Sequence, residues 1–122
     1  KEDKDNDVLY IEDVTYAGYK WESCSFMFYK NRLHYVGFVT ECGKRNATRI
    51  YDTILGNIVR KYPQVSRRMV VDKPSKKNAS FEDGNVALSI SYSIDGEGGF
   101  ATLLYMDRAT AVEINKDELN DL

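Results

Sequence analysis

The chain contains 122 residues, of which 43% are hydrophobic and 30% are charged, and its formal net charge is -2. This length fits one domain with one hydrophobic core, and no apolar run approaches the roughly 18 residues of a membrane-spanning helix. Acidic and basic residues are interspersed without a long basic block, which disfavours a nucleic-acid partner. We therefore expect a single globular domain that has no membrane span and binds no nucleic acid.

The first seven residues are charged or polar and contain no apolar side chain. They predict a charged N-terminal tether over residues 1–7, followed by a single α+β domain over residues 8–122. A start of this kind often follows a removed export signal or a lipid-anchored cysteine. We therefore expect an exported protein, and a lipid anchor upstream of residue 1 is one way to hold such a domain at an envelope.

The first half of the chain predicts strands. Residues Val8 to Tyr16 are rich in β-branched and aromatic side chains, which favours a first strand. Two further β-prone runs, Trp21 to Tyr29 and Leu33 to Cys42, are separated by Lys30-Asn31-Arg32. This short polar segment predicts a hairpin loop, because Asn tolerates a left-handed backbone conformation.

Alternation along this hairpin predicts two apolar faces. One contains Cys24, Phe26, Phe28, His34, Val36, Phe38 and Cys42, and the other contains Trp21, Met27, Tyr29, Leu33, Tyr35 and Val39. The first set is the better candidate for the core, because the second is rich in aromatics that tolerate water at one end. Exposed aromatics supply binding area, so Trp21, Tyr29 and Tyr35 are the candidate binding residues. The alternative is that they pack beneath the N-terminal strand or the C-terminal tail.

Residues Arg45 to Tyr62 predict the main helix. Apolar residues recur there at spacings of three and four, and Pro63 ends the pattern. Gly43 or Asn46 is the expected start. Gly56, in the middle, is expected to let the helix approach the sheet closely.

The second half predicts a strand at Val65 to Val71, a loop over Asp72 to Ser80, and a strand at Val86 to Ile94 that alternates apolar and small residues. A glycine-rich turn from Asp95 then leads to a strand at Phe100 to Met106, and Asn115 to Leu122 predicts a short helix. The order of elements disfavours a parallel sheet. We therefore expect an α+β fold with an antiparallel sheet of about five or six strands and one main helix packed on one face.

Few residues suggest catalysis. The single histidine, His34, makes a multi-histidine metal or catalytic centre impossible. Cys24 and Cys42 are expected to be free thiols, because hairpin pairing places them some 13 Å apart along the strands. The remaining enzyme hypotheses are a Cys24 or Cys42 pair with His34, and a pair of carboxylates taken from Glu12, Asp13, Glu22 and Glu41. We expect no cofactor and no metal.

Five segments of the chain form a recurring pattern: Tyr16-Ala17-Gly18-Tyr19, Phe26-Met27-Phe28, Val36-Gly37-Phe38 to Cys42, the helix end Lys61-Tyr62-Pro63, and Thr102-Leu103-Leu104-Tyr105. Together they resemble small uncharacterised exported or lipoprotein-like domains of Bacteroidetes. The resemblance covers most of residues 15–107 and implies an α+β fold and an envelope location; it carries no established activity. An upstream "G-I-x-W-G" segment and a preceding helix, common in such domains, are not present in this chain.

Two functions follow from these observations. The leading hypothesis is a non-enzymatic envelope or secreted domain that binds a macromolecule, a protein or a glycan, through an aromatic sheet face. The alternative is a small hydrolase or ligand-binding enzyme that uses carboxylates or a cysteine–histidine pair.

Overall fold

The computed structural model describes residues 6–62 and 66–120. Within these ranges the chain forms seven strands and two helices. The elements are β1 (Asn6–Tyr16), β2 (Tyr19–Tyr29), β3 (Arg32–Gly43), α1 (Lys44–Lys61), β4 (Ser66–Lys73), β5 (Lys76–Asp83), β6 (Val86–Asp95), β7 (Gly98–Asp107) and α2 (Arg108–Asn120).

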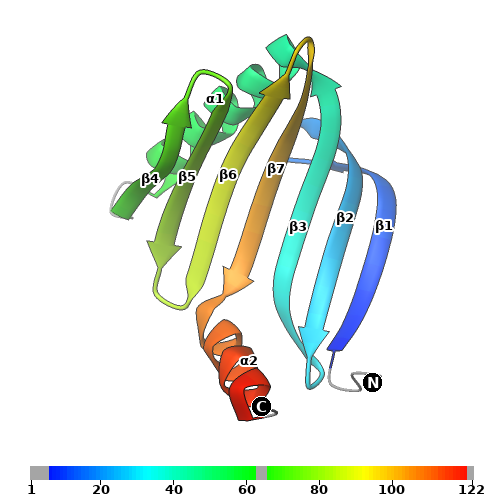
Figure 1. Ribbon diagram of the computed structural model, residues 1–122, viewed down its shortest axis with the longest axis vertical. Coiled ribbons are helices and arrows are strands. Elements are labelled where there is room, and N and C mark those ends of the chain that lie inside the picture. The colour runs from blue at the N-terminus through cyan, green and yellow to red at the C-terminus, as the bar shows by residue number, and fades with distance from the viewer. Residues whose placement is uncertain (1–5, 63–65, 121–122) are drawn as a thin grey trace.

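All seven strands belong to one antiparallel sheet with the order β1-β2-β3-β7-β6-β5-β4 (Figure 1). The sheet is made of two runs of hairpin-connected strands, β1 to β3 and β4 to β7, which meet where β3 pairs with β7. Helix α1 connects the two runs and packs on one face, against β6, β7 and β3. The predicted α+β class and antiparallel sheet are confirmed, but the sheet has seven strands rather than five or six.

The strand missing from the prediction is β5, most of which was expected to be a loop. Only Ala79 and Phe81 of this strand are buried apolar residues, so its hydrophobic alternation is short. The other face is polar and is held by side-chain hydrogen bonds: Asn78 donates to Ser89 Oγ at 3.2 Å and Ser80 donates to Asn78 Oδ1 at 3.1 Å. A strand with such a polar face lacks the hydrophobic alternation that predicts a strand, so its sequence predicts a loop.

Helix α1 begins within one residue of its predicted start, with Gly43 as its N-cap residue, and the predicted apolar stripe supplies its buried side chains. Close approach to the sheet, however, occurs elsewhere than expected. No atom lies within 4 Å of the position a Cβ would take at Gly56, whereas at Gly99 of β7 that position is 3.1 Å from the Ala47 Cβ. The expected role of Gly56 is therefore wrong, and Gly99 is the residue that admits the helix.

The core lies between α1 and the sheet and includes Tyr51, Ile90 and Leu103. It also includes Trp21, which the alternation placed on the opposite face. The β1–β2 strand pair bends near Asp13, whose φ of 55° is left-handed. In Figure 1 the end of β1 and the start of β2 turn behind β3. Trp21 is thereby turned into the core, where its Nε1 donates to the Tyr16 carbonyl at 2.9 Å.

Helix α2 begins seven residues before the predicted position. Its cap is Asp107, whose carboxylate accepts from the Thr110 N–H at 3.3 Å and from the Thr110 hydroxyl at 3.1 Å. The hydrogen bond from Asn85, followed in effect by those from Thr110, holds the pKa of Asp107 below its usual value. The cap therefore fixes the start of α2 at the end of β7.

Candidate functional site

The three predicted binding residues do not form one exposed surface. Trp21 is 1% exposed and Tyr29 is 4% exposed, so the expectation that they face solvent is wrong. Tyr29 is covered by α2 and its hydroxyl donates to the Asp117 carboxylate. Tyr35 is half-buried, and burial raises its pKa. Its ring lies over Gly37, where the phenol carbons and oxygen come within 2.8 to 3.0 Å of the position of a Cβ.

The cysteine and histidine residues also lie apart. Cys24 pairs with Phe38, and His34 lies four residues from Phe38 along β3, a distance of about 13 Å. Cys42 lies a further four residues in the other direction. Both thiols are free, as predicted, and burial raises the pKa of each; for Cys42, Glu22 and Glu41 add to the effect. A raised pKa disfavours the reactive thiolate, so the geometry gives the cysteine–histidine hypothesis no support.

The four carboxylates considered for hydrolysis, Glu12, Asp13, Glu22 and Glu41, are all exposed. Glu22 is engaged in holding the sheet, since its Oε1 accepts a hydrogen bond from the Glu41 N–H at 2.6 Å. Among the described residues, no group of three or more His, Cys, Asp and Glu side chains could hold a metal ion. The arrangement therefore offers no catalytic constellation at the predicted positions.

The most unusual feature of the surface is strand β1. Four consecutive apolar residues of this strand are exposed: Val8 by 62%, Leu9 by 52%, Tyr10 by 58% and Ile11 by 39%. Successive side chains of a strand point to opposite faces, so both faces of β1 are open to solvent. Apolar side chains on both faces of an exposed strand are typical of a surface that another chain covers.

The position of β1 in the sheet explains this exposure. It is the outermost strand, and it pairs with β2 in continuous register from Asn6 opposite Tyr29 to Glu12 opposite Ser23. Its outer side faces no other strand of the sheet, so alternate residues direct backbone N–H and C=O groups outward. Figure 1 shows β1 at the border of the sheet, while α1 lies behind the other half.

Neighbouring residues of β2 extend the apolar surface on both faces. On the face that carries α1, Leu9 pairs with Phe26, and on the opposite face Val8 pairs with Met27. Phe26 and Met27 are themselves only half-buried. The edge therefore combines outward backbone groups with an apolar strip on each face.

The opposite edge strand, β4, is built differently. Its register with β5 shifts between Met69 and Val71, which marks a bulge, and its sequence contains Arg67, Arg68, Asp72 and Lys73. Bulges and charged side chains are the usual means by which proteins block pairing at a sheet edge. β1 contains neither Pro, Lys nor Arg, and its only charges are Asp7, Glu12 and Asp13.

Comparison of the chain with protein-family models, with curated proteins and with solved structures gave no match. The resemblance to exported domains of Bacteroidetes therefore stays a prediction. Neither α1 nor α2, the helices of the described ranges, is both long and apolar enough to span a membrane.

The sequence contains one signal for this site. The run Val8-Leu9-Tyr10-Ile11 has four apolar residues without the polar alternation of a strand with one solvated face. Such a run usually indicates a strand buried on both faces. Only the strand order, which places β1 at the edge, shows that both faces are instead available for binding.

Proposed function

We propose that this domain is a non-enzymatic binding module that takes up an extended segment of another protein as an additional strand beside β1. The proposal rests chiefly on one observation, the exposure of Val8 to Ile11 on both faces of an edge strand with continuous register. Strand addition of this kind gains affinity from backbone hydrogen bonds and specificity from alternate side chains. The proposed partner surface is therefore the first strand, whereas the sequence predicts the aromatic face of the hairpin.

The side chains of β1 define the partner's pattern. An added strand would place its central residues beside Leu9 and Ile11 on one face and beside Val8 and Tyr10 on the other, where apolar or aromatic residues pack best. The ends of the strip are acidic, with Asp7 before it and Glu12 and Asp13 after it. The expected partner is therefore a segment of about seven residues with an apolar centre and Lys or Arg at both ends.

A second copy of β1 fits this edge poorly. Antiparallel pairing of two copies, centred on the four apolar residues, places Asp7 of one copy opposite Glu12 of the other, twice by symmetry. Like charges directly opposite each other destabilise a strand pair. Charge complementarity therefore favours a basic partner over self-association.

Titration with synthetic peptides tests the proposal. A peptide with alternating Val and Thr at its centre and Lys at both ends should perturb the backbone amide resonances of β1, and the same peptide with Glu at both ends should bind more weakly. The variant Leu9→Lys should lower the affinity for the Lys-ended peptide by about tenfold or more, since the substitution removes an apolar contact and adds a like charge. Val59→Lys on α1 is the matched control, because Val59 is also an exposed aliphatic residue, at 43%.

The proposal fails if neither peptide shifts β1, or if Leu9→Lys and Val59→Lys have the same effect. A preference for the Glu-ended peptide would also contradict the electrostatic part. Equal far-ultraviolet circular dichroism of the two variants shows that a loss of binding does not reflect unfolding.

An envelope location remains part of the proposal. Its support is the resemblance described above; residues 1–5 lie outside the described ranges, and β1 itself begins at Asn6, within the predicted tether. Fractionation of cells that produce the protein from its complete gene tests this point. Recovery in the cytoplasmic fraction would contradict it.

A further inference from the structure

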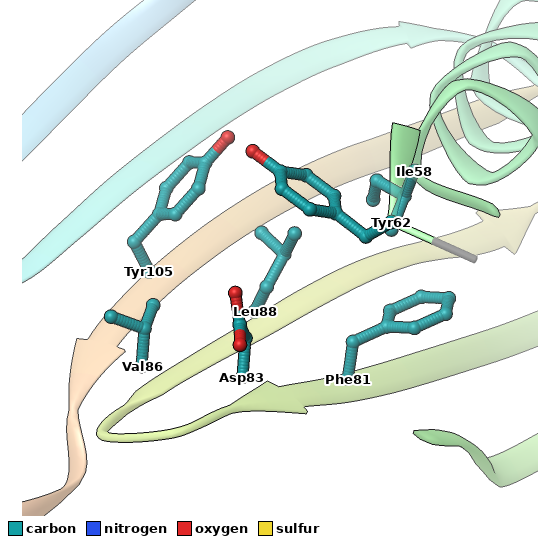
Figure 2. A pocket seen from close by; sticks show the side chains of 7 residues that line it. All are labelled: Ile58, Tyr62, Phe81, Asp83, Val86, Leu88 and Tyr105. Atoms are coloured by element: carbon teal, nitrogen blue, oxygen red, sulfur yellow. The ribbon is translucent and has the colours of Figure 1, made fainter. Parts of the chain in front are cut away.

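A pocket of about 180 Å³ lies where the C-terminal end of α1 approaches β5, β6 and β7 (Figure 2). None of its lining residues belongs to β1. Its lining residues are Ile58, Tyr62, Phe81, Asp83, Val86, Leu88 and Tyr105. The pocket therefore forms a site separate from the β1 edge.

Sheet register builds the floor of this pocket. Phe81 pairs with Leu88 and Leu88 pairs with Tyr105, so these three side chains form one row across β5, β6 and β7. Asp83 and Val86 pair in the next row toward the end of the sheet. Tyr62, directly after α1, covers the row from the helix side in Figure 2.

The pocket combines three aromatic rings with one negative charge. The rings belong to Tyr62, Phe81 and Tyr105, and the carboxylate of Asp83 stands between the Tyr105 and Phe81 side chains in Figure 2. The Asp83 side chain is exposed and makes no hydrogen bond or ion pair with another described residue. No basic side chain lines the pocket, so the carboxylate is available to a cationic ligand.

Aromatic faces attract cations through their ring quadrupoles, and cages of such rings recognise quaternary ammonium groups. The remaining walls, Ile58, Val86 and Leu88, suit the methyl groups of such an ion. The volume is below the roughly 300 Å³ at which sites for drug-sized molecules begin, so the pocket fits a small head group. A carboxylate beside the rings adds a preference for positive charge over a neutral group of the same shape.

Tyr105, which forms one wall of the pocket, is held in place by residues of β1 and β3. The Tyr105 hydroxyl is hydrogen-bonded to the Tyr16 hydroxyl at 3.0 Å, and the two rings meet edge to face with centroids 6.3 Å apart. Tyr16 is in turn stacked on Phe38 at 4.4 Å. These contacts hold the Tyr105 ring in place before any ligand binds, which lowers the ordering cost of binding.

We infer that this pocket binds a small quaternary ammonium group through the Tyr62, Phe81 and Tyr105 rings and the Asp83 carboxylate. The inference is independent of the proposed peptide site. The group can be carried by a free compound or by a trimethylated lysine side chain, and both present the same methylated cation to the pocket.

Ligand titration followed by nuclear magnetic resonance tests the inference on the unmodified protein. The probes are choline, N-acetyl-trimethyllysine amide, and 3,3-dimethylbutan-1-ol, which is the uncharged isostere of choline. Choline or the trimethyllysine amide should shift the resonances of Leu88 and Val86, and choline should bind at least about tenfold more tightly than its isostere. The tighter of the two cations identifies the source of the group.

The variant Asp83→Asn should reduce choline affinity by about tenfold and reduce the preference over the isostere, while Asp95→Asn, at the end of β6, should leave both unchanged. Leu9→Lys at β1 should also leave choline binding unchanged. The inference is overturned if neither cation binds, if choline and its isostere bind equally, or if Asp83→Asn has the same effect as Asp95→Asn. The isostere comparison uses the unmodified chain, so it stands even if a variant is unstable.

Discussion

The two ends of the sheet follow opposite rules. At the β4 end, the edge carries a bulge and several basic residues. At the β1 end, the register of β1 runs without a shift to Glu12, and apolar residues are exposed on both faces. One edge is thus protected against pairing, and the other has the properties of an edge that accepts a partner.

The residues that stabilise the fold therefore differ from those that are exposed for contact with a partner. Most of the buried core residues, including Ile90 and Leu103, lie on α1 and the strands that it packs against, and β2 adds Trp21 and Cys24. Residues Val8 to Ile11 of β1 stay outside the core, where they contribute little to the folding of the single chain.

The largest expected effect comes from one substitution made in both halves. Leu103 is 1% exposed and Leu9 is 52% exposed, so Leu103→Ala leaves a cavity and Leu9→Ala does not. Leu103→Ala should lower the free energy of unfolding by about 2–5 kcal/mol, and Leu9→Ala should change it by at most about 0.5 kcal/mol. Urea denaturation measures both, and equal losses would show that β1 is part of the core.

A smaller effect is expected at the start of α2, the helix that joins the halves by running from the end of β7 to the β2–β3 turn. Asp107→Ala removes the cap of this helix and should cost roughly 1 kcal/mol. Asp107→Asn is the control, because Asn also caps helices well. Amide hydrogen exchange in α2 should increase for the Ala variant and change little for the Asn variant; equal exchange in the two variants would assign the effect to charge rather than capping.

The variant Tyr16→Phe tests the contact between Tyr16, at the end of β1, and Tyr105 of β7. The ring and its stacking on Phe38 remain, but the hydrogen bond to Tyr105 is lost, which should cost about 0.5–1 kcal/mol in unfolding free energy. Burial first, and then this hydrogen bond, raise the pKa of Tyr105. In the variant that pKa should fall while staying above its ordinary value of 10.0, which an ultraviolet titration of the tyrosines detects. An unchanged midpoint for Tyr105 would contradict the contact.

The smallest expected effect is a pH dependence of the ion pairs that join α2 to the residues around the β2–β3 turn. Lys30 lies 3.3 Å from Glu113 and 3.1 Å from Asp117, and Arg32 also contacts Glu113. Hydrogen bonds from Tyr29 and then Lys30 lower the pKa of Asp117, and those from Arg32 and Lys30 lower that of Glu113.

Because both folded-state pKa values are lowered, the stabilisation is complete above the ordinary values of 3.8 and 4.5 and is lost as pH falls through the folded values. Protection factors of the α2 amides, which are exchange rates corrected for the intrinsic pH dependence, should therefore fall as pH drops below these ordinary values, before the core unfolds. These groups are exposed, so 1 M salt should weaken the attachment at neutral pH as well. Insensitivity to both acid and salt would show that α2 is held by other contacts.

Much of the fold could be predicted from local patterns. The apolar stripe of α1, the strict alternation of β6 and the turns at Asn31 and Gly96 are each encoded within a few residues, and the structure has all of them. Strand β5 could not be predicted, because its inner face has only Ala79 and Phe81 as buried apolar residues. The start of α2 could not be predicted, because its cap, Asp107, is itself the last residue of β7 and no loop marks it.

The candidate site could be predicted much less well. Assigning Trp21 to a face requires the bend near Asp13, and a change of one position in alternation moves a side chain to the other side of the sheet. Tyr29 is buried by α2, which lies more than eighty residues later in the chain. Whether Val8 to Ile11 are core or surface depends on strand order, which arises from the pairing of β3 with β7 rather than from any local pattern.

Amide hydrogen exchange along β1, with and without the Lys-ended peptide, tests the central claim most directly. If a partner strand pairs with this edge, alternate amides between residues 7 and 13 should become protected, because alternate residues point outward from β2, while amides of α1 should not change. Protection that spares β1, or that appears instead on β4, would contradict the account.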